Sequence, residues 1–527
     1  MKSIITVLCL IAAQSAFAQV KENTWTTPDN GVAGINDVNV SGTGFPNGTI
    51  TPSNVVISLA ATCGGTPVAT TTAISVRAII GSSKRVDFQI PATLATGTYY
   101  VSLSDSAAGD AHFTNATCSA VNVTHSNSTL AACLPSSSLG VLVPSTPGKV
   151  TAYVPNASWE LSSTGIQVVD LEGGTSKTSI STPNPVNSCS SNPATGQTVC
   201  TANTTDVYLI SGTALTNTLT SGATGSASFS GGSCENCGVA INALSNKALI
   251  NIGLSASPTG SGVQLLDLNT NTFSTPVNAT TGVVSENPSI DPTRNLILSA
   301  SENNTYTLFQ IQSDGTTLKE FGSASPTDTN GSAEADSSGE DCSTGIAIAP
   351  MEFTNDVYLA DLTQATFTPG SPAGTWNAPN STTTLVTNYT FSAGLSGVSV
   401  AVGTSHLAVV TGEFGGNTFA VLQLPSKSGS GTPNIVDYAV AQIPDSAVCG
   451  GSFVAGRDPH TITAYTSPND GKAYAVFANG YNAPPSCLVR IDLAAILAAP
   501  RGGGGYAAND VSPANFPAGA ATFYSTH

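Results

Sequence analysis

The chain has 527 residues, and only 9% of them are charged, against about 25% in a typical soluble domain. Its 32 acidic and 15 basic residues give a net charge of −17. This balance excludes nucleic acid and anionic lipid headgroups as partners, because phosphate recognition needs clustered Lys and Arg. Apolar residues make up 40% of the chain, and their strand-like periodicity excludes a disordered protein.

The N-terminus has the layout of a cleaved secretory signal peptide. Met1-Lys2 is followed by the apolar stretch Ile4 to Ala13 and by the small-residue site Ala16-Phe17-Ala18. We therefore expect residues 1–18 to be removed near Ala18 and the protein to be secreted to the periplasm, the cell surface or the medium. No later segment approaches roughly 18 uninterrupted apolar residues, which predicts that the chain has no membrane span.

Residues 31–125, after a polar lead at 19–30, alternate short apolar runs with Gly and Pro, which predicts a β-sandwich. Its motifs are Gly42-Thr43-Gly44-Phe45, Ile90-Pro91 and the strand Gly97 to Leu103. In these motifs the segment resembles the IPT/TIG family of immunoglobulin-like domains. The resemblance implies an Ig-like fold and no catalysis. Residues 126–138 are expected to link this domain to the rest.

Within the predicted propeller domain at 139–527, a longer pattern recurs seven times between residues 139 and 493: two alternating apolar runs around a polar turn, then a closing stretch of the type Val-x-x-Asp-Leu. The closing anchors are Leu171, Ile210, Leu268, Ile311, Leu362, Leu424 and Leu493. A spacing of about fifty residues is typical of one four-stranded propeller blade. The predicted fold is therefore all-β: an Ig-like sandwich followed by a seven-bladed β-propeller, with Asn515 to Thr526 supplying a missing outer strand.

Two of these units carry a closer resemblance. Ile290 to Leu298 contains the turn Asp291-Pro292-Thr293-Arg294-Asn295, and Thr466 to Tyr474 contains Pro468-Asn469-Asp470-Gly471-Lys472. A hydrophobic strand followed by a Pro-Asp-Gly-Lys-type turn is similar to the hairpins of the YVTN and NHL repeat families. Physically, such a turn needs residues that accept positive φ or preset a bend.

Apart from Cys9 in the signal peptide, the chain has ten cysteines, an even number that predicts disulfides in an exported protein. Two pairs have a local argument: Cys63 with Cys118, and Cys189 with Cys200 across one hairpin turn. The Cys-x-x-Cys motif at 234–237 begins a blade rather than a helix, so we expect structural disulfides there, for example to Cys342, and no redox activity. The unassigned cysteines are Cys133, Cys234, Cys237, Cys342, Cys449 and Cys487.

The segments ahead of the innermost strands gather at one mouth of a propeller channel, and here they are acidic. Their candidate metal ligands are Glu235, Glu286, Glu340 and Asp341, and their candidate catalytic residues are Asp458 and His460. Crowded carboxylates can bind a cation such as Ca²⁺, and a histidine there can act as a general base. The other interpretation, which we favour, is that these residues are turn formers at exposed loop ends.

Two functions remain open. The first is a monomeric, exported binding or structural scaffold, with the Ig-like domain as a spacer and with a protein or carbohydrate as ligand. The second is a metal-dependent propeller hydrolase of the lactonase type, with Glu235, Glu286, Asp341 and His460 around one divalent cation. The fold alone does not decide between them, because propellers carry both kinds of activity. The scaffold needs no further residues and is the favoured hypothesis.

Overall fold

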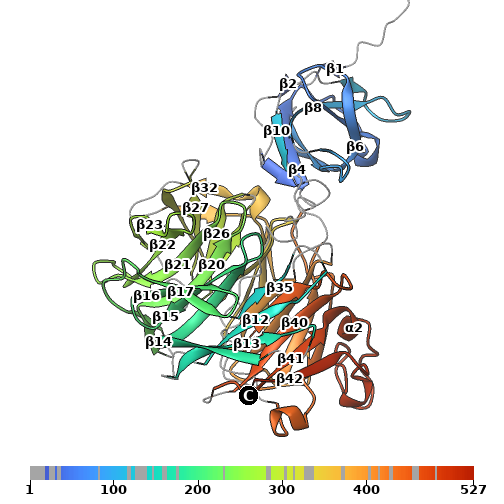
Figure 1. Ribbon diagram of the computed structural model, residues 1–527. Helices are drawn as coiled ribbons and strands as arrows, with labels where there is room; N and C mark the ends of the chain where they lie inside the picture. The colour runs from blue at the N-terminus through green and yellow to red at the C-terminus, as the bar shows by residue number, and fades with distance from the viewer. Residues whose placement is uncertain are drawn as a thin grey trace, which may run out of the picture. The chain divides into compact units, whose positions relative to one another are not determined.

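A computed structural model describes residues 18–526 except 20, 23–29, 33–36, 81–82, 96, 115–119, 125–138, 145–146, 157–162, 174–176, 230–231, 281–286, 293, 302–304, 313–314, 326–336, 369–373, 402–404, 413–415, 426–430, 454–461 and 481–483. The predicted signal peptide up to Phe17 and the predicted linker at 126–138 lie outside these residues. The chain divides into two compact units, 1–34 with 38–124 and 35–37 with 125–527 (Figure 1). Within the described part, no helix has the length and apolar character to cross a membrane.

The first unit is a β-sandwich. Its strands are β1 (Ala18–Gln19), β2 (Lys21–Glu22), β3 (Asn30–Val32), β4 (Asp37–Thr43), β5 (Val56–Ala60), β6 (Pro67–Ile80), β7 (Ser83–Gln89), β8 (Gly97–Asp105), β9 (Phe113–Thr114) and β10 (Ala120–Thr124), with the 3-10 turn η1 (Pro52–Asn54). The long β6 pairs with β5 in one sheet and with β7 in the other. Strand β8 alternates, so Val101 and Leu103 are buried in the core between the sheets.

The second unit is a propeller of seven antiparallel blades, as the repeat predicts. Blade 1 contains β11 (Gly140–Leu142), β12 (Thr151–Pro155), β13 (Thr164–Asp170) and the start of β14 (Lys177–Asn192); blade 2 contains the end of β14, β15 (Gln197–Ala202), β16 (Asp206–Ser211) and β17 (Ala214–Thr220). Blade 3 contains β20 (Asn236–Asn242), β21 (Lys247–Gly253), β22 (Ser261–Asp267) and the short β23 (Thr272–Phe273) and β24 (Val277–Asn278), after the hairpin β18 (Ala227–Phe229) and β19 (Gly232–Cys234).

Blade 4 contains β25 (Ser289–Asp291), β26 (Leu296–Ser301), β27 (Thr305–Ile311) and β28 (Leu318–Ala324); blade 5 contains β29 (Gly339–Asp341), β30 (Ile346–Pro350), β31 (Asp356–Asp361) and β34 (Asn380–Thr384), with η2 (Leu362–Gln364). Blade 6 contains β35 (Leu395–Ala401), β36 (Leu407–Gly412), β37 (Thr418–Gln423) and β38 (Asp437–Gln442); blade 7 contains β39 (Ile462–Thr466), β40 (Ala473–Asn479), β41 (Cys487–Asp492) and β42 (Ala521–Ser525). The connections include η3 (Ala447–Cys449), the short helix α2 (Leu493–Leu497) and η4 (Pro513–Asn515).

A second hairpin, besides β18–β19, has no counterpart in the predicted repeat. The hairpin of β32 (Thr366–Thr368) and β33 (Thr375–Asn377) leaves blade 5 and adds to the outer edge of blade 4 through β28. Trp376 anchors it, since its buried indole Nε1 donates to the carbonyl oxygen of Tyr306 at 2.7 Å. The hairpin thus covers the edge of β28 at one point, where Ser323 pairs with Thr375.

The closing anchors of the repeat lie at the ends of the third strands, and all seven side chains are buried. Four of them show why the position recurs. The backbone N–H groups of Leu268, Ile311, Leu362 and Leu424 donate to the last residue of the turn between the first and second strands of their own blade, at 2.8–3.1 Å. The anchor thereby closes the third strand onto that turn while its side chain enters the core.

In the described residues, blades 1 and 7 close the ring without sharing a strand. Their side chains form one hydrophobic cluster that includes Val154, Val476 and Tyr524, and β12 lies close to β40 and β41 in Figure 1. Thr463 donates to the carbonyl oxygen of Leu139 at 2.7 Å, and the Tyr524 hydroxyl donates to the carbonyl oxygen of Leu171. Strand β42 pairs with β41 along its length, so the C-terminal segment does supply the outer strand of blade 7.

Candidate functional site

We call the turn between the first and second strand of each blade its inner turn. In blades 2 to 7 the last residue of this turn has a positive φ between 50° and 74°: Gly196, Asn246, Asn295, Gly345, His406 and Gly471. In several blades the first residue is Asn or Asp, and its Oδ1 accepts backbone N–H groups of its own turn, as Asn242 does from Leu244 at 3.0 Å. The repeat therefore fixes one short turn geometry at one end of the ring.

Neighbouring inner turns bind one another through these same two positions. Asn192 of blade 2 donates from Nδ2 to Oδ1 of Asn246 in blade 3 at 2.7 Å. Asn242 of blade 3 makes the same contact with Asn295 in blade 4 at 3.1 Å. The first residue of one turn thus reaches the left-handed residue of the next. Asn suits the second position because it adopts positive φ more readily than most residues.

From blade 4 to blade 6 the contacts between inner turns use charged side chains instead. Asp341 of blade 5 lies 2.6 Å, Oδ2 to Nδ1, from His406, the left-handed residue of blade 6. Blade 5 has Gly345 at this position, and the Arg294 guanidinium of blade 4 lies where a Cβ there would project. Arg294 pairs with Asp291 at 2.5 Å and also donates to the carbonyl oxygen of Cys342 at 3.1 Å.

We expect His406 to act mainly as a contact between blades 5 and 6. His406→Gly keeps the positive φ at no steric cost but removes one partner of the buried Asp341 carboxylate, which also accepts from Ser343. This should lower stability by about 1–3 kcal/mol. His406→Asn restores the amide type of contact found at Asn246, so its loss should be smaller. Guanidinium unfolding midpoints check this order; equal midpoints for the wild type and the Gly variant would contradict it.

Glu340, next to Asp341 in β29, is a buried carboxyl group. The residue is 5% exposed, and neither carboxyl oxygen has a hydrogen-bond partner within the described part of the chain. Burial, and secondly the charge of Asp291, raise the pKa of Glu340 well above its usual range, while the Arg294 guanidinium opposes this shift. Glu340 therefore holds its proton to higher pH than an exposed glutamate.

The structure corrects the expected position of the acidic residues. Glu340 and Asp341 do not precede an innermost strand but form its end, beside the inner turn. The inner strands run parallel from blade to blade, as the parallel bridge between Asn287 and Ser337 shows. Glu235 precedes its inner strand, β20, and therefore lies at the opposite end from Glu340 and Asp341. A seven-residue strand separates the two ends by roughly 20 Å. The sequence-predicted residues Glu286, Asp458 and His460 lie outside the described residues.

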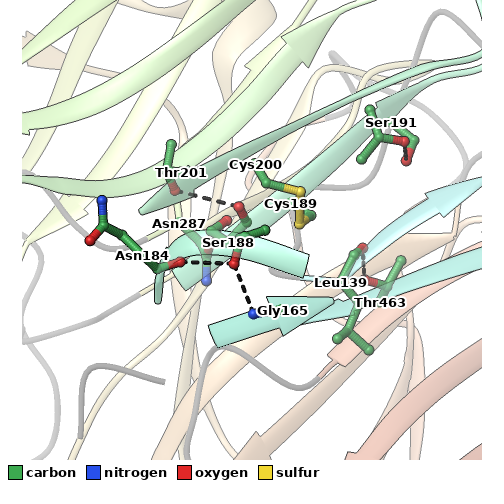
Figure 2. Close-up of a disulfide and its surroundings, with 12 residues drawn as sticks. Leu139, Gly165, Asn184, Ser188, Cys189, Ser191, Cys200, Thr201, Asn287 and Thr463 are labelled. Atoms are coloured by element: carbon green, nitrogen blue, oxygen red, sulfur yellow. Dashed lines mark hydrogen bonds between the residues drawn. A yellow bond between two sulfur atoms is a disulfide. The ribbon is translucent and has the colours of Figure 1, made fainter. Parts of the chain in front are cut away.

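The inner strands are polar yet buried. Ser188, Asn287 and Ser399 are each no more than 2% exposed. Ser399 accepts from the backbone N–H of Ala464 at 2.9 Å, and Thr201 donates to the carbonyl oxygen of Ser188 at 3.4 Å (Figure 2). These groups hold inner strands to their neighbours. Within the described ranges, no group of three or more His, Cys, Asp or Glu side chains is placed to hold a metal ion.

Three disulfides are described. Cys189 and Cys200 join the first two strands of blade 2 (Figure 2), and Cys449 joins Cys487 of β41. Cys234 and Cys237 pair with each other instead of with a distant cysteine, because the bend between β19 and β20 brings their Cα atoms to 5.3 Å, within the normal disulfide range. Cys63 and Cys342 are also disulfide-bonded, whereas Cys118 and Cys133 lie outside the described residues.

A groove of about 520 Å³ lies between blades 3 and 4. Blade 3 contributes Lys247, Asp267 and Phe273, and the turn between β27 and β28 of blade 4 contributes Thr316 and Thr317. Successive turns of an antiparallel sheet lie at alternate ends of the strands. The turn between the third and fourth strands therefore lies at the same end as the inner turn, and so does the groove. Sequence reasoning missed it. The sequence gives one indication of the groove: Asp267 belongs to a closing Val-x-x-Asp-Leu stretch, and Lys247 directly follows the inner turn of the same blade.

The Lys–Asp pair of the groove recurs in the repeat. Lys247 Nζ lies 2.6 Å from Asp267 Oδ2, and in blade 7 Lys472 lies 2.7 Å from Asp492 at the corresponding positions. The two sites differ in burial, since the Lys247 side chain is 11% exposed and that of Lys472 is 54% exposed. The repeat thus provides the pair, and the groove of blade 3 encloses it.

The comparisons with known proteins do not identify the chain. No protein family matches the sequence, and no curated protein matches it. Among solved structures, a candidate 6-phosphogluconolactonase from Bacteroides uniformis is similar over 72% of this chain and 97% of that one, with 11% identical residues and a TM-score of 0.43. A similarity this low gives no information about what this chain binds or converts.

Proposed function

We propose that the chain is an exported binding scaffold, in which the propeller presents a rigid ligand-binding face. The observation that supports this most is how the ionisable residues of the inner turns are used. Arg294, paired with Asp291 in its own turn, donates to the carbonyl oxygen of Cys342 in blade 5. Asp341 contacts His406 of blade 6 in the way that Asn192–Asn246 and Asn242–Asn295 connect other blades. These ionisable residues therefore have a structural role, which is to connect neighbouring blades of the ring.

The finer parts of the proposal rest on the sequence. Residues 1–18 act as a signal peptide, the sandwich at 31–125 is an IPT/TIG-like spacer, and the blades belong to the YVTN/NHL type of repeat. Disulfides in both units fit export, since they persist in oxidising compartments. The polar, charge-poor surface favours uncharged extracellular ligands, either carbohydrate or protein.

The hydrolase of the lactonase type requires a metal held by several carboxylates at one mouth. Glu340 and Asp341 are adjacent, but Glu235 lies at the opposite end of the inner strands. The described residues therefore support the scaffold better.

The scaffold proposal is tested by equilibrium binding of the purified full chain to extracellular polysaccharides and proteins, with and without EDTA. We expect saturable binding to one class of polymer, unchanged by EDTA, with the polymer recovered intact. Chemical conversion of the bound polymer, dependent on a divalent cation, would overturn the scaffold in favour of the hydrolase.

A further inference from the structure

The groove between blades 3 and 4 contains a buried cation with hydrogen-bonding capacity to spare. Lys247 is 9% exposed, and its ammonium group contacts Asp267 Oδ2 at 2.6 Å. An ammonium group has three N–H donors. Within the described residues, Lys247 Nζ uses one of them, in the hydrogen bond to Asp267. Gly315 leaves space beside the Lys247 side chain, where an added Cβ would come within 3.6 Å of Cε.

Asp267 keeps the pair ionised and nearly neutral as a whole. Its pKa is lowered chiefly by the hydrogen bond from Lys247 and further by the backbone N–H of Asn269, which donates to Oδ1 at 2.9 Å. The Asp267 carboxylate is therefore occupied by its own protein partners. The lysine, in contrast, can still donate to oxygen atoms of a ligand in the groove.

The rest of the lining combines an apolar wall with hydroxyl groups. Phe273 and Pro276 are half-buried and line one side, and Thr272, Thr316 and Thr317 expose hydroxyl-bearing side chains around it. The volume of about 520 Å³ lies within the usual range of about 300–1,000 Å³ for small-ligand sites. An aromatic face beside several polar groups suits a molecule that has both C–H faces and many hydroxyl groups.

We propose that this groove binds a neutral saccharide, with Lys247 donating to sugar oxygen atoms and Phe273 packing against a sugar ring. The proposal rests on the scaffold function and names its ligand class. A neutral sugar is favoured over an anionic one because the charges of Lys247 and Asp267 compensate each other. The net charge of −17 would also repel an anionic ligand.

The repeat offers a matched control for testing this site. Lys247→Met removes the buried donor in the groove, and Lys472→Met removes the corresponding, largely exposed lysine of blade 7. Phe273→Ala removes the apolar wall while leaving the ion pair intact. Calorimetric titration with neutral gluco-, xylo- and N-acetylglucosamine oligosaccharides, and with an oligogalacturonate, gives the affinities of the four proteins.

We expect one neutral oligosaccharide to bind, and Lys247→Met and Phe273→Ala each to weaken it by about tenfold or more, with Lys472→Met unchanged. Far-UV circular dichroism and melting temperatures check that each variant is folded. The groove proposal fails if none of the neutral sugars binds, if Lys472→Met weakens binding as much as Lys247→Met, or if the oligogalacturonate binds best. The scaffold proposal fails separately, through cation-dependent conversion of a bound polymer.

Discussion

Deletion of residues 501–527 should lower the melting temperature of the propeller more than substitution of His406 or Lys247. The deletion removes β42, the outer strand of blade 7, and with it the buried side chains of Val511, Ala520 and Tyr524. Full burial of one large apolar side chain contributes about 1.5–3 kcal/mol, so the loss should reach several kcal/mol. It also uncovers the edge of β41.

The deleted segment also holds blade 6. Arg501 makes a forked ion pair with Asp437 at 2.7 and 3.0 Å, and the backbone of Val440 exchanges hydrogen bonds with Asn509 and Val511 at 2.8–2.9 Å. The closing tail therefore supports the outer strands of two neighbouring blades. Its loss should expose β38 as well as β41 and promote aggregation through these edges.

Tyr524→Phe is the matched control for the deletion. It keeps the ring in the cluster between blades 1 and 7 and removes only the hydroxyl that donates to Leu171, which should cost about 1 kcal/mol. Tyr524→Ala leaves a cavity at the same place and should cost about 3–5 kcal/mol. Differential scanning calorimetry of the four proteins measures the series. An unchanged melting temperature after the deletion would contradict closure by the tail.

Glu340→Gln should stabilise the protein at neutral and alkaline pH and leave it unchanged in acid. The folded-state pKa of Glu340 lies well above the ordinary value of 4.5, so the native state binds more protons than the unfolded chain. This contribution to stability is fully present below the unfolded pKa and is lost as pH rises through the folded pKa. Gln carries no charge at any of these pH values and does not suffer the loss.

The expected gain in the free energy of unfolding at pH 8 is about 1–3 kcal/mol, the cost of leaving a buried polar or charged group unsatisfied. Urea unfolding at pH 4 and pH 8 measures it. Glu235→Gln is the control, because Glu235 is only half-buried and lies at the other end of the inner strands. If Glu340→Gln were no more stable than the wild type at pH 8, Glu340 would have a partner that neutralises its charge.

The architecture was predictable because the propeller repeats its physical requirements. Each blade needs an apolar anchor after its third strand and a turn residue with positive φ, and these positions recur as Leu268 or Leu424 and as Asn246 or Gly345. The hairpin around Trp376 was not predictable, since it pairs with a strand of another blade through one inserted segment. Such pairing leaves no periodic signal in the sequence.

The candidate sites were harder to predict than the fold. The sequence placed Glu340 and Asp341 ahead of a strand, whereas they are the last two residues of the three-residue strand β29, next to the inner turn. The contact between Asp341 and His406 joins residues of neighbouring blades, 65 positions apart in the chain. The groove depends on the burial of one Lys–Asp pair among several similar ones, and burial is set by the neighbouring blade.

The most direct test of the scaffold function is a turnover measurement on the wild type, Glu340→Gln and Asp341→Asn. Proton release from a panel of five- and six-membered lactones is followed by pH-stat titration, with Ca²⁺ and with EDTA. The scaffold account predicts that all three proteins release protons no faster than buffer under both conditions. Ca²⁺-dependent turnover by the wild type that disappears in either variant would contradict it and assign catalysis to the carboxylates of blade 5.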